Sequence, residues 1–284
     1  MYTPFGAKLT GEAVLTEYPR PQMMRNSYLN LNGLWDFTYA PGDAMPEEYD
    51  EQIRVPFPPE SKLSLVESTA PKGKDLWYRR EFTLPDGFDR GRVLLHFGAV
   101  DQIATVYCNG QEVCRHTGGY TGFTAELTGL LESGENELVV QVKDLLTDGV
   151  CSYGAQKRYS PWSGIWQSVW CESVPAEYIA AVHFRPFPAE DELEVTVIPG
   201  GDAVTGQSCG VTIRGVRYEV PADEPTRIPA ANLQRWTPEN PKLYGVEITL
   251  GEDTVKSYCA MRSLEFGWDG SGSKRLLLNG KKET

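Results

Sequence analysis

Histidines are the first residues to test for chemistry, because their side chains bind metals and carry protons at neutral pH. His96, His116 and His183 lie far apart, and none has metal-ligand spacing to a cysteine or a carboxylate. The sequence contains no G-x-S-x-G nucleophile motif, and residues 279–282 lack the first glycine and the Ser/Thr of a phosphate loop. We therefore expect no metal, no cofactor and no self-sufficient active site of these kinds.

Acidic clusters are the second candidates, since paired carboxyl groups can act as acid, base or nucleophile. Glu47-Glu48, Glu190-Asp191-Glu192 and Glu252-Asp253 all lie in polar, turn-like stretches. Acidic side chains are seldom buried without a partner, so these clusters are expected to be solvated loops.

Composition limits the classes of partner. The 284 residues suggest about two domains, and the net charge of -12 repels nucleic acids and anionic lipids. No apolar run approaches the roughly 18 residues that span a bilayer, and no secretory signal is visible at the start. We expect a cytoplasmic protein with no nucleic-acid or membrane partner.

The six cysteines are scattered and show no C-x-x-C spacing. Cys108 and Cys114 flank Asn109-Gly110, a strong signal for a two-residue hairpin turn. Such a turn would place Cys108 opposite Gln111 and Cys114 opposite Thr105, with the two sulfurs on opposite faces of the sheet. The sequence therefore predicts free thiols.

Apolar residues alternate with polar ones at period two over many short segments, which is typical of half-buried strands. The clearest examples lie around residues 105–108, 138–143, 165–172, 192–197 and 246–250. Turn residues separate these segments, so the chain is predicted to be all-β, with sandwiches or barrels. A strand ends near Pro175, and about seven strands follow up to Arg262, as in an immunoglobulin-like sandwich.

Several short segments occur together and in order along nearly the whole chain. They are PRP at 19–21, LNGLWDF at 31–37, VPFPPES at 55–61, LWYRREF at 76–82, VYCNG at 106–110, GGYTGF at 118–123, GENEL at 134–138, SGIWQSVW at 163–170 and WTPENPKLY at 236–244. This combination resembles the family 2 glycoside hydrolases, which include β-galactosidases, β-glucuronidases and β-mannosidases.

The resemblance implies a jelly-roll, galactose-binding-like β-sandwich at residues 1–175 and an immunoglobulin-like β-sandwich at 176–263. Residues 264–284 would form a linker and the start of a catalytic (β/α) barrel, which carries both catalytic glutamates in this family. Retaining hydrolysis needs two carboxyl groups about 5 Å apart. We therefore expect no catalytic residue in this chain, and expect its own barrel to be a partner.

In the family, a loop just before the strand at Ser163-Gly164-Ile165-Trp166 helps to hold the terminal sugar. Here that loop, residues 153–162, offers Gln156, Lys157 and Arg158 where some relatives have an aspartate, and it ends with Trp162 as a further candidate. This departure weakens a galactoside assignment, and a basic side chain would suit an acidic sugar.

The loop containing Glu60 and Ser61 is the second candidate for substrate binding. Each set of candidates also has a plainer interpretation. Glu60 and Ser61 could cap a turn, Trp162 could pack on the sandwich edge, and residues 156–158 could be a solvated loop. Trp35, Trp77, Trp166 and Trp170 are expected to pack in the core.

The leading hypothesis is the non-catalytic amino-terminal part of a retaining β-glycosidase in carbohydrate metabolism, with a β-glycoside as ligand. The alternative is a stand-alone carbohydrate-binding protein. A structural, adhesion-type pair of sandwiches is the third hypothesis, and a homo-oligomer is compatible with all three.

Overall fold

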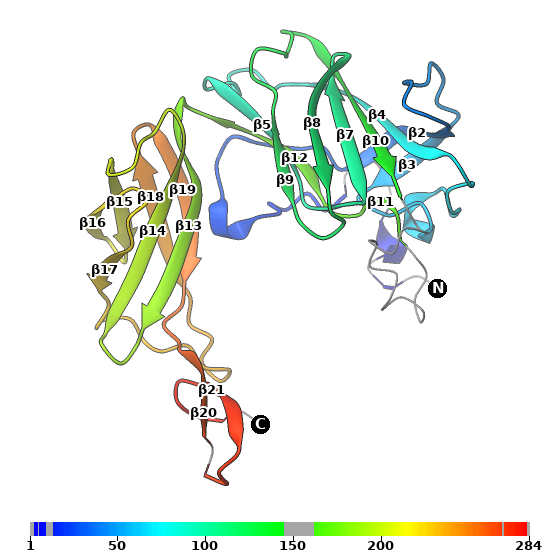
Figure 1. Ribbon diagram of the computed structural model, residues 1–284. Coiled ribbons are helices and arrows are strands. Elements are labelled where there is room, and N and C mark those ends of the chain that lie inside the picture. The colour runs from blue at the N-terminus through cyan, green and yellow to red at the C-terminus, as the bar shows by residue number, and fades with distance from the viewer. Residues whose placement is uncertain (1–2, 5, 10–13, 145–161, 269, 283–284) are drawn as a thin grey trace. The chain divides into compact units, whose positions relative to one another are not determined.

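The computed structural model describes residues 3–4, 6–9, 14–144, 162–268 and 270–282, and its regular structure is almost entirely β-strand (Figure 1). The short 3-10 helices are η1 (Gly6–Lys8), η2 (Pro21–Met23) and η3 (Lys62–Ser64). The all-β prediction is confirmed. The chain divides into a first unit, Met1–Pro19 with Ser27–Val174, and a second unit, Arg20–Asn26 with Pro175–Thr284. The predicted first domain, residues 1–175, is thus interrupted by a segment that packs with the second unit.

The first unit is a sandwich of two antiparallel sheets. In sheet order, the four-stranded sheet contains β1 (Tyr28–Asn30), β12 (Val169–Val174), β5 (Arg92–Phe97) and β9 (Phe123–Glu126). The six-stranded sheet contains β3 (Glu51–Val55), β2 (Gly33–Ala40), β4 (Asp75–Thr83), β10 (Glu135–Lys143), β7 (Ile103–Cys108) and β8 (Gln111–Thr117). The short strands β6 (Val100–Asp101) and β11 (Gly164–Ile165) pair separately. The predicted continuous strand at 165–172 is therefore two strands in different sheets.

The core of this sandwich is formed by inward-facing side chains of both sheets. Trp35 and Phe37 of β2, Tyr78 of β4, and Phe97 of β5 are at most 1% exposed. Burial of large aromatic side chains is a major source of stability in such a core. The alternation seen in the sequence thus corresponds to one face packed inward, as period two requires.

The hairpin at Asn109-Gly110 differs from the prediction in one respect. Both turn residues have positive φ, as the predicted turn requires, and Cys108 lies opposite Gln111. A register shift between Val106 and Tyr107 places Cys114 opposite Val106 instead of Thr105. Cys108 and Cys114 therefore lie on the same face, and both pack against the core. Their predicted placement on opposite faces is wrong because an extra residue in β8 changes the register. The five described cysteines are free thiols, as predicted.

The sandwich of the second unit has seven strands in two sheets, in agreement with the predicted immunoglobulin-like sandwich. One sheet contains β13 (Glu177–Phe187), β14 (Glu192–Gly201) and β17 (Thr226–Pro229). The other contains β16 (Val216–Pro221), β15 (Ser208–Ile213), β18 (Tyr244–Leu250) and β19 (Asp253–Cys259). Leu193, Val195 and Val197 of β14 and Val246, Ile248 and Leu250 of β18 belong to one apolar cluster.

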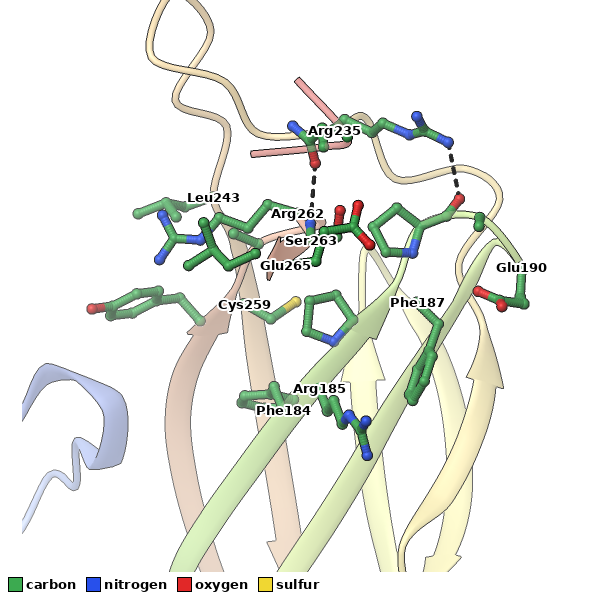
Figure 2. Close-up of a pocket in the computed structure, with 18 residues that line it drawn as sticks. Phe184, Arg185, Phe187, Glu190, Arg235, Leu243, Cys259, Arg262, Ser263 and Glu265 are labelled. Atoms are coloured by element: carbon green, nitrogen blue, oxygen red, sulfur yellow. Dashed lines mark hydrogen bonds between the residues drawn. The ribbon is translucent and has the colours of Figure 1, made fainter. Parts of the chain in front are cut away.

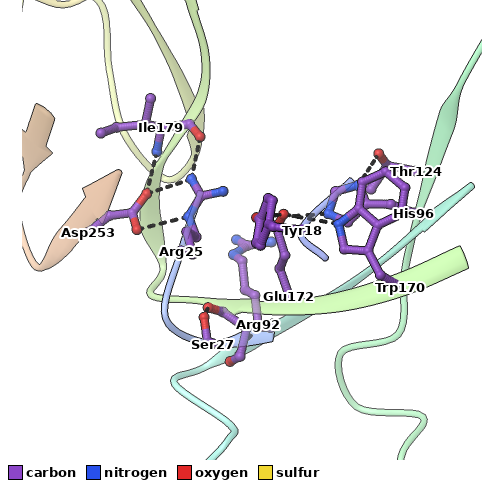
Figure 3. A network of polar contacts seen from close by, with 11 residues as sticks. Tyr18, Arg25, Ser27, Arg92, His96, Thr124, Trp170, Glu172, Ile179 and Asp253 are labelled. Atoms are coloured by element: carbon purple, nitrogen blue, oxygen red, sulfur yellow. Dashed lines mark hydrogen bonds and ion pairs between the residues drawn. The ribbon is translucent and has the colours of Figure 1, made fainter. Parts of the chain in front are cut away.

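The segment Arg20–Asn26 is bound to the second unit by main-chain and side-chain contacts. Met24 forms an isolated bridge with Lys256 of β19. Arg25 donates to both carboxylate oxygens of Asp253, at 3.1 and 2.8 Å, and both residues are buried (Figure 3). Ile179 N also donates to Asp253, at 2.9 Å. The prediction that Asp253 is solvated is wrong, because a distant arginine pairs with it.

The outer face of β12 is also buried, which the alternating pattern did not predict. Glu172 is 0% exposed and accepts hydrogen bonds from the Tyr18 hydroxyl and, at 3.1 Å, from Trp170 Nε1 (Figure 3). His96 stacks on Trp170, and its Nδ1 lies 2.8 Å from Thr124 Oγ1. The amino-terminal segment with Tyr18 thus covers a face that the sequence pattern assigned to solvent.

A hairpin of β20 (Leu264–Trp268) and β21 (Lys274–Leu278) follows the second sandwich. Phe266 and Trp268 are 75% and 73% exposed, and Leu276 lies directly opposite Phe266. The hairpin therefore presents an apolar face to solvent. No helix within the described residues is long and apolar enough to cross a membrane.

Candidate functional site

The first unit contains a pocket of about 530 Å³ where three loops come together. These are the loop after β3, the β8–β9 loop and the segment around β11. Most of the lining is apolar or aromatic, and includes Leu15, Phe57, Leu63, Tyr120, Trp162 and Trp166. Ser61 and Asp101 contribute polar groups. This volume falls within the usual range for a small-molecule site.

Glu60 ties two of these loops together. One Glu60 carboxylate oxygen accepts from Ser163 Oγ at 2.5 Å, and the other accepts from Ser163 N at 3.2 Å. Burial raises the pKa of Glu60, although the bonds from Ser163 act in the opposite direction. The next residue, Ser61, caps η3 by accepting from Leu63 N at 3.0 Å. These contacts fix the loop that carries Ser61 and Leu63 into the pocket.

Trp166 is positioned by the β8–β9 loop. Its Nε1 donates to Gly119 O at 2.7 Å, and its ring meets the Tyr120 ring edge to face at a centroid distance of 6.2 Å. Trp166 lies between β11 and β12 and is only partly buried. The prediction that it packs in the core is therefore wrong, because the strand pattern breaks at this point and turns the indole toward the pocket.

Leu15 reaches the pocket because its main chain is held to β1 and the following turn. Asn30 Nδ2 donates to Leu15 O at 2.8 Å, and Asn32 Nδ2 donates to the same oxygen at 3.2 Å. Asn32 also accepts from Val169 N at 2.9 Å. Amide side chains therefore position this part of the amino-terminal segment.

Three carboxyl groups in this region have raised pKa values. Burial raises the pKa of Asp101, and a Cβ at Gly119 would lie only 2.6 Å from the Asp101 carboxyl carbon. Burial, followed by the charges of Asp101 and Glu60, raises the pKa of Asp144 to about 7. The region is therefore a poor binding site for an additional negative charge. In the part of the chain that the structure describes, no group of three His, Cys, Asp or Glu side chains could hold a metal ion.

The structure brings some of the predicted site residues together. Ser61 and Trp162 both line the pocket, while Glu60 lies behind it and braces the loops. Gln156, Lys157 and Arg158 lie outside the described residues.

Sequence reasoning missed Leu15, Asp101, Tyr120 and Trp166. The glycine-rich turn around Tyr120 contributed only to the family resemblance, although a large aromatic residue close to several glycines is a signal for an exposed ring.

The second unit has a cleft of about 860 Å³ at the base of the β20–β21 hairpin (Figure 2). Arg185, Arg235 and Arg262 line it, but each is already engaged. Arg235 donates to Pro188 O at 3.1 Å, and the other two guanidinium groups lie over the rings of Phe187 and Trp236. The pocket of the first unit is the stronger candidate site, because exposed aromatic side chains, Tyr120 and Trp162, line it.

Comparison with known proteins identifies a known domain in the first unit. Residues 43–175 match the family model described as the sugar-binding domain of glycosyl hydrolases family 2. The chain is 26% identical over 226 residues to a putative β-glucuronidase of Formosa agariphila, a match that covers 72% of this chain and 27% of that protein. It is also 26% identical over 227 residues to a β-galactosidase of Thermoanaerobacter pseudethanolicus, covering 72% and 30% respectively.

Solved structures agree at the level of the fold. The β-glucuronidase from Ruminococcus gnavus in complex with D-glucuronic acid has a TM-score of 0.73 at 22% identity, covering 93% of this chain and 50% of that one. This chain thus spans half the length of that solved relative and under a third of the two curated ones. The order of motifs, the two sandwiches and the matched domain together lead to one conclusion: the chain contains, at residues 43–175, the sugar-binding domain of glycosyl hydrolases family 2.

Proposed function

We propose that this chain forms the amino-terminal, substrate-binding part of a retaining β-glycosidase that acts on a β-glucuronide or a β-galactoside. One observation carries the proposal: two exposed aromatic rings, Tyr120 and Trp162, line a single preformed pocket together with Trp166. Aromatic faces next to a few polar groups are the usual elements of a site for a small organic ligand. The names of the relatives supply the class of substrate.

Binding by the chain itself is the direct test. Titration with methyl β-D-glucuronide and methyl β-D-galactoside, followed by NMR chemical-shift changes, should perturb the indole signals of Trp162 and Trp166. Lys157 and Arg158 are the candidates for recognising an acidic sugar, so the double change K157A/R158A should weaken the glucuronide more than the galactoside. Absence of any shift with either sugar would contradict the proposal.

Hydrolysis is proposed to require a catalytic barrel that carries the two glutamates. Both oxygens of Glu60 already accept bonds from Ser163, so this carboxylate is poorly suited to attack a sugar. We expect the chain alone to leave nitrophenyl β-glycosides intact. Release of nitrophenol by this chain, at a rate above that of a catalytically unrelated control protein, would overturn this part of the proposal.

The apolar face of the β20–β21 hairpin is the proposed contact for that barrel. Phe266 and Trp268 are among the most exposed large apolar side chains of the described residues, and such a patch commonly marks an interaction surface. Coding sequence downstream of Thr284 should translate into a barrel with two glutamates at strand ends. A stop codon directly after Thr284 would contradict this role.

A stand-alone carbohydrate-binding protein is the second candidate function. It is favoured by one observation: the described lining residues of the pocket all belong to the first unit, which is compatible with ligand binding by that unit alone. The same stop codon, combined with measurable sugar binding, would favour this candidate over the enzyme.

A further inference from the structure

We propose that the cleft of the second unit is an additional binding site, and that it takes a carboxylate-bearing sugar, a uronate. The cleft shares no lining residue with the pocket of the first unit. The site therefore goes beyond the proposed function, and only the choice of a sugar as the bearer of the carboxylate rests on that function.

The lining of the cleft reverses the charge balance of the chain. The whole sequence has 39 acidic and 27 basic residues. Among the lining residues, the arginines outnumber the acidic side chains, since Arg185, Arg235 and Arg262 face only Glu190 and Glu265 (Figure 2). The cleft is thus a cationic spot on an acidic protein, and charge complementarity favours an anionic occupant.

Contacts within the protein orient two of these guanidinium groups without using all their donors. Arg235 donates to Pro188 O at 3.1 Å, which occupies one of its terminal nitrogens. The Arg262 guanidinium lies over the Trp236 ring at 4.7 Å from the ring centroid, a contact that needs no hydrogen-bond acceptor. Within the described residues, neither Arg235 nor Arg262 forms an ion pair. Both can therefore donate to a carboxylate, whose geometry matches the guanidinium fork.

The third arginine has a weaker claim. Arg185 lies over the Phe187 ring at 4.9 Å, and its guanidinium is 4.0 Å from a carboxylate oxygen of Glu194. Part of its charge is therefore balanced within the protein. Arg235 and Arg262 are the residues on which the site depends.

The segment that carries Arg235 is fixed to the rest of the second unit. Trp236 N donates to Met261 O at 2.8 Å, and Asn279 Nδ2 donates to Trp236 O at 2.9 Å. Ser263 N in turn donates to Asn279 Oδ1 at 3.1 Å. These bonds hold the wall of the cleft in place before a ligand arrives, which lowers the entropy cost of binding.

The other lining side chains favour an organic carboxylate over an inorganic anion. Phe184, Tyr258 and Leu243 line the cleft, and Leu243 is 50% exposed. The volume of about 860 Å³ falls within the range of small-molecule sites. A uronate combines C–H faces, which pack on apolar side chains, with a carboxylate, which pairs with arginine. The match of residues 43–175 to a sugar-binding domain supports a sugar as the bearer of that carboxylate.

The proposed barrel contact uses other residues of the β20–β21 hairpin. Phe266, Trp268 and Leu276 form its exposed apolar face, and none of them lines the cleft. A uronate in the cleft and a barrel at the apolar face therefore do not require the same side chains.

The experiment compares a charged ligand with its neutral counterpart on the full chain. Digalacturonate and its dimethyl ester are titrated at low salt, and dissociation constants are obtained from the NMR shifts of the Trp236 indole signal. We expect the acid to bind at least about tenfold more tightly than the ester, because only the acid can form ion pairs with the arginines. This preference should shrink as salt is added.

Three variants localise the effect. The double change Arg235→Gln with Arg262→Gln should reduce the preference to less than about threefold. Arg262→Gln alone should at least halve it, and this single variant decides the matter if the double variant does not fold. Arg214→Gln is the matched control, because Arg214 also donates to a main-chain oxygen, Asn232 O at 2.7 Å, but does not line the cleft. It should change neither constant, and amide spectra of each variant verify folding.

The outcomes separate this site from the proposed function. Equal affinity for the acid and the ester overturns the site, and so does a preference that survives in the double variant. Shifts confined to Trp162 and Trp166 would place the acid in the pocket of the first unit, which overturns the site and leaves the proposed function standing. Binding of the acid at the cleft, with no methyl glycoside bound by the first unit, supports the site and contradicts the proposed function.

An acidic protein segment is the competing occupant. An acetylated, amidated diglutamate peptide carries as many carboxylates as digalacturonate but no sugar ring. Weaker binding of the peptide supports the uronate, whereas binding as tight as that of digalacturonate overturns the assignment to a sugar.

Discussion

Among the described residues, each unit buries one carboxylate completely, and each uses it to hold part of the same amino-terminal stretch. In the first unit Glu172 binds Tyr18, and in the second unit Asp253 binds Arg25; both carboxylates are 0% exposed (Figure 3). The recorded contacts differ in geometry. Asp253 has a cationic partner with two bonds, whereas Glu172 contacts a hydroxyl, an indole N–H and, at 3.7 Å, His96 Nε2.

This difference sets how each unit responds to the loss of a partner. Removing the arginine leaves a buried charge without its counter-ion, which is among the most destabilising changes a protein can undergo. Removing one donor to Glu172 leaves its other contacts in place. We therefore expect the second unit to depend on a single residue, and the first unit to depend on a network.

Arg25→Ala should have the largest effect on stability. It leaves Asp253 buried with its bond from Ile179 N but without the arginine, so the second unit should lose about 3–5 kcal/mol of unfolding free energy. Urea denaturation with hydrogen exchange resolved by peptide would measure this. Arg227→Ala is the control, since its pair with Glu192 is exposed and should contribute less than about 1 kcal/mol. Equal losses for the two variants would show that the buried Arg25–Asp253 pair stabilises the second unit no more than an exposed pair does.

Glu172→Gln should have a smaller effect, confined to the first unit. The amide keeps one acceptor for Tyr18 or Trp170, but it brings an N–H₂ group into a site built from donors. A loss of about 1–3 kcal/mol is expected for such a mismatch. A loss as large as that of Arg25→Ala, measured by the same denaturation, would show that the network behaves as an ion pair.

The buried carboxylates Glu172 and Asp253 also show where sequence reasoning fails. Alternation at period two correctly predicted β10, β14 and β18, since each strand packs one face into the core of its sandwich. It placed Glu172 and Asp253 in solvent, because their partners lie 154 and 228 positions away and leave no local signal. The bulge before Cys114 is missed for a related reason, as one extra residue reverses which face a side chain occupies.

The candidate site was partly accessible from the sequence. Trp162 and Ser61 were predicted from the resemblance, and both line the pocket. Leu15 could not be predicted, because its place depends on Asn30 and Asn32 binding its main-chain oxygen. Trp166 was missed because a regular strand was assumed through a segment where the chain changes sheets.

Tyr18→Phe tests the contacts around Glu172 by removing one hydroxyl. The first unit should lose about 1 to 2 kcal/mol, since a hydrogen bond to a charged group is stronger than one between neutral groups. Amide exchange should accelerate at residues 14–18 and leave residues 20–26 unchanged. Faster exchange at residues 20–26 would mean that the Tyr18–Glu172 and Arg25–Asp253 contacts are energetically coupled.

The last expected effect is a difference in pH dependence between the units. Burial, with the charges of Asp101 and Glu60, raises the pKa of Asp144 from 3.8 to about 7. The folded first unit therefore binds this proton more tightly than the unfolded chain does. Its contribution to stability is complete below pH 3.8 and is lost as the pH rises through 7. Asp144→Asn should make the decline of the first unit's Tm between about pH 4 and 7 shallower.

Glu219 of the second unit supplies the opposite case. Its bonds from Ser208 and Arg217 lower its pKa below the usual 4.5, so its stabilising contribution is present above that pH and is lost as the pH falls further. Glu219→Gln should accordingly alter the second unit only in acid, and by little, because the side chain is exposed. Calorimetric scans of both variants from about pH 3 to pH 8 would show two opposite slopes. Parallel slopes in the two units would contradict the assignment of raised carboxyl pKa values to the pocket region, because burial in that region is what separates Asp144 from Glu219.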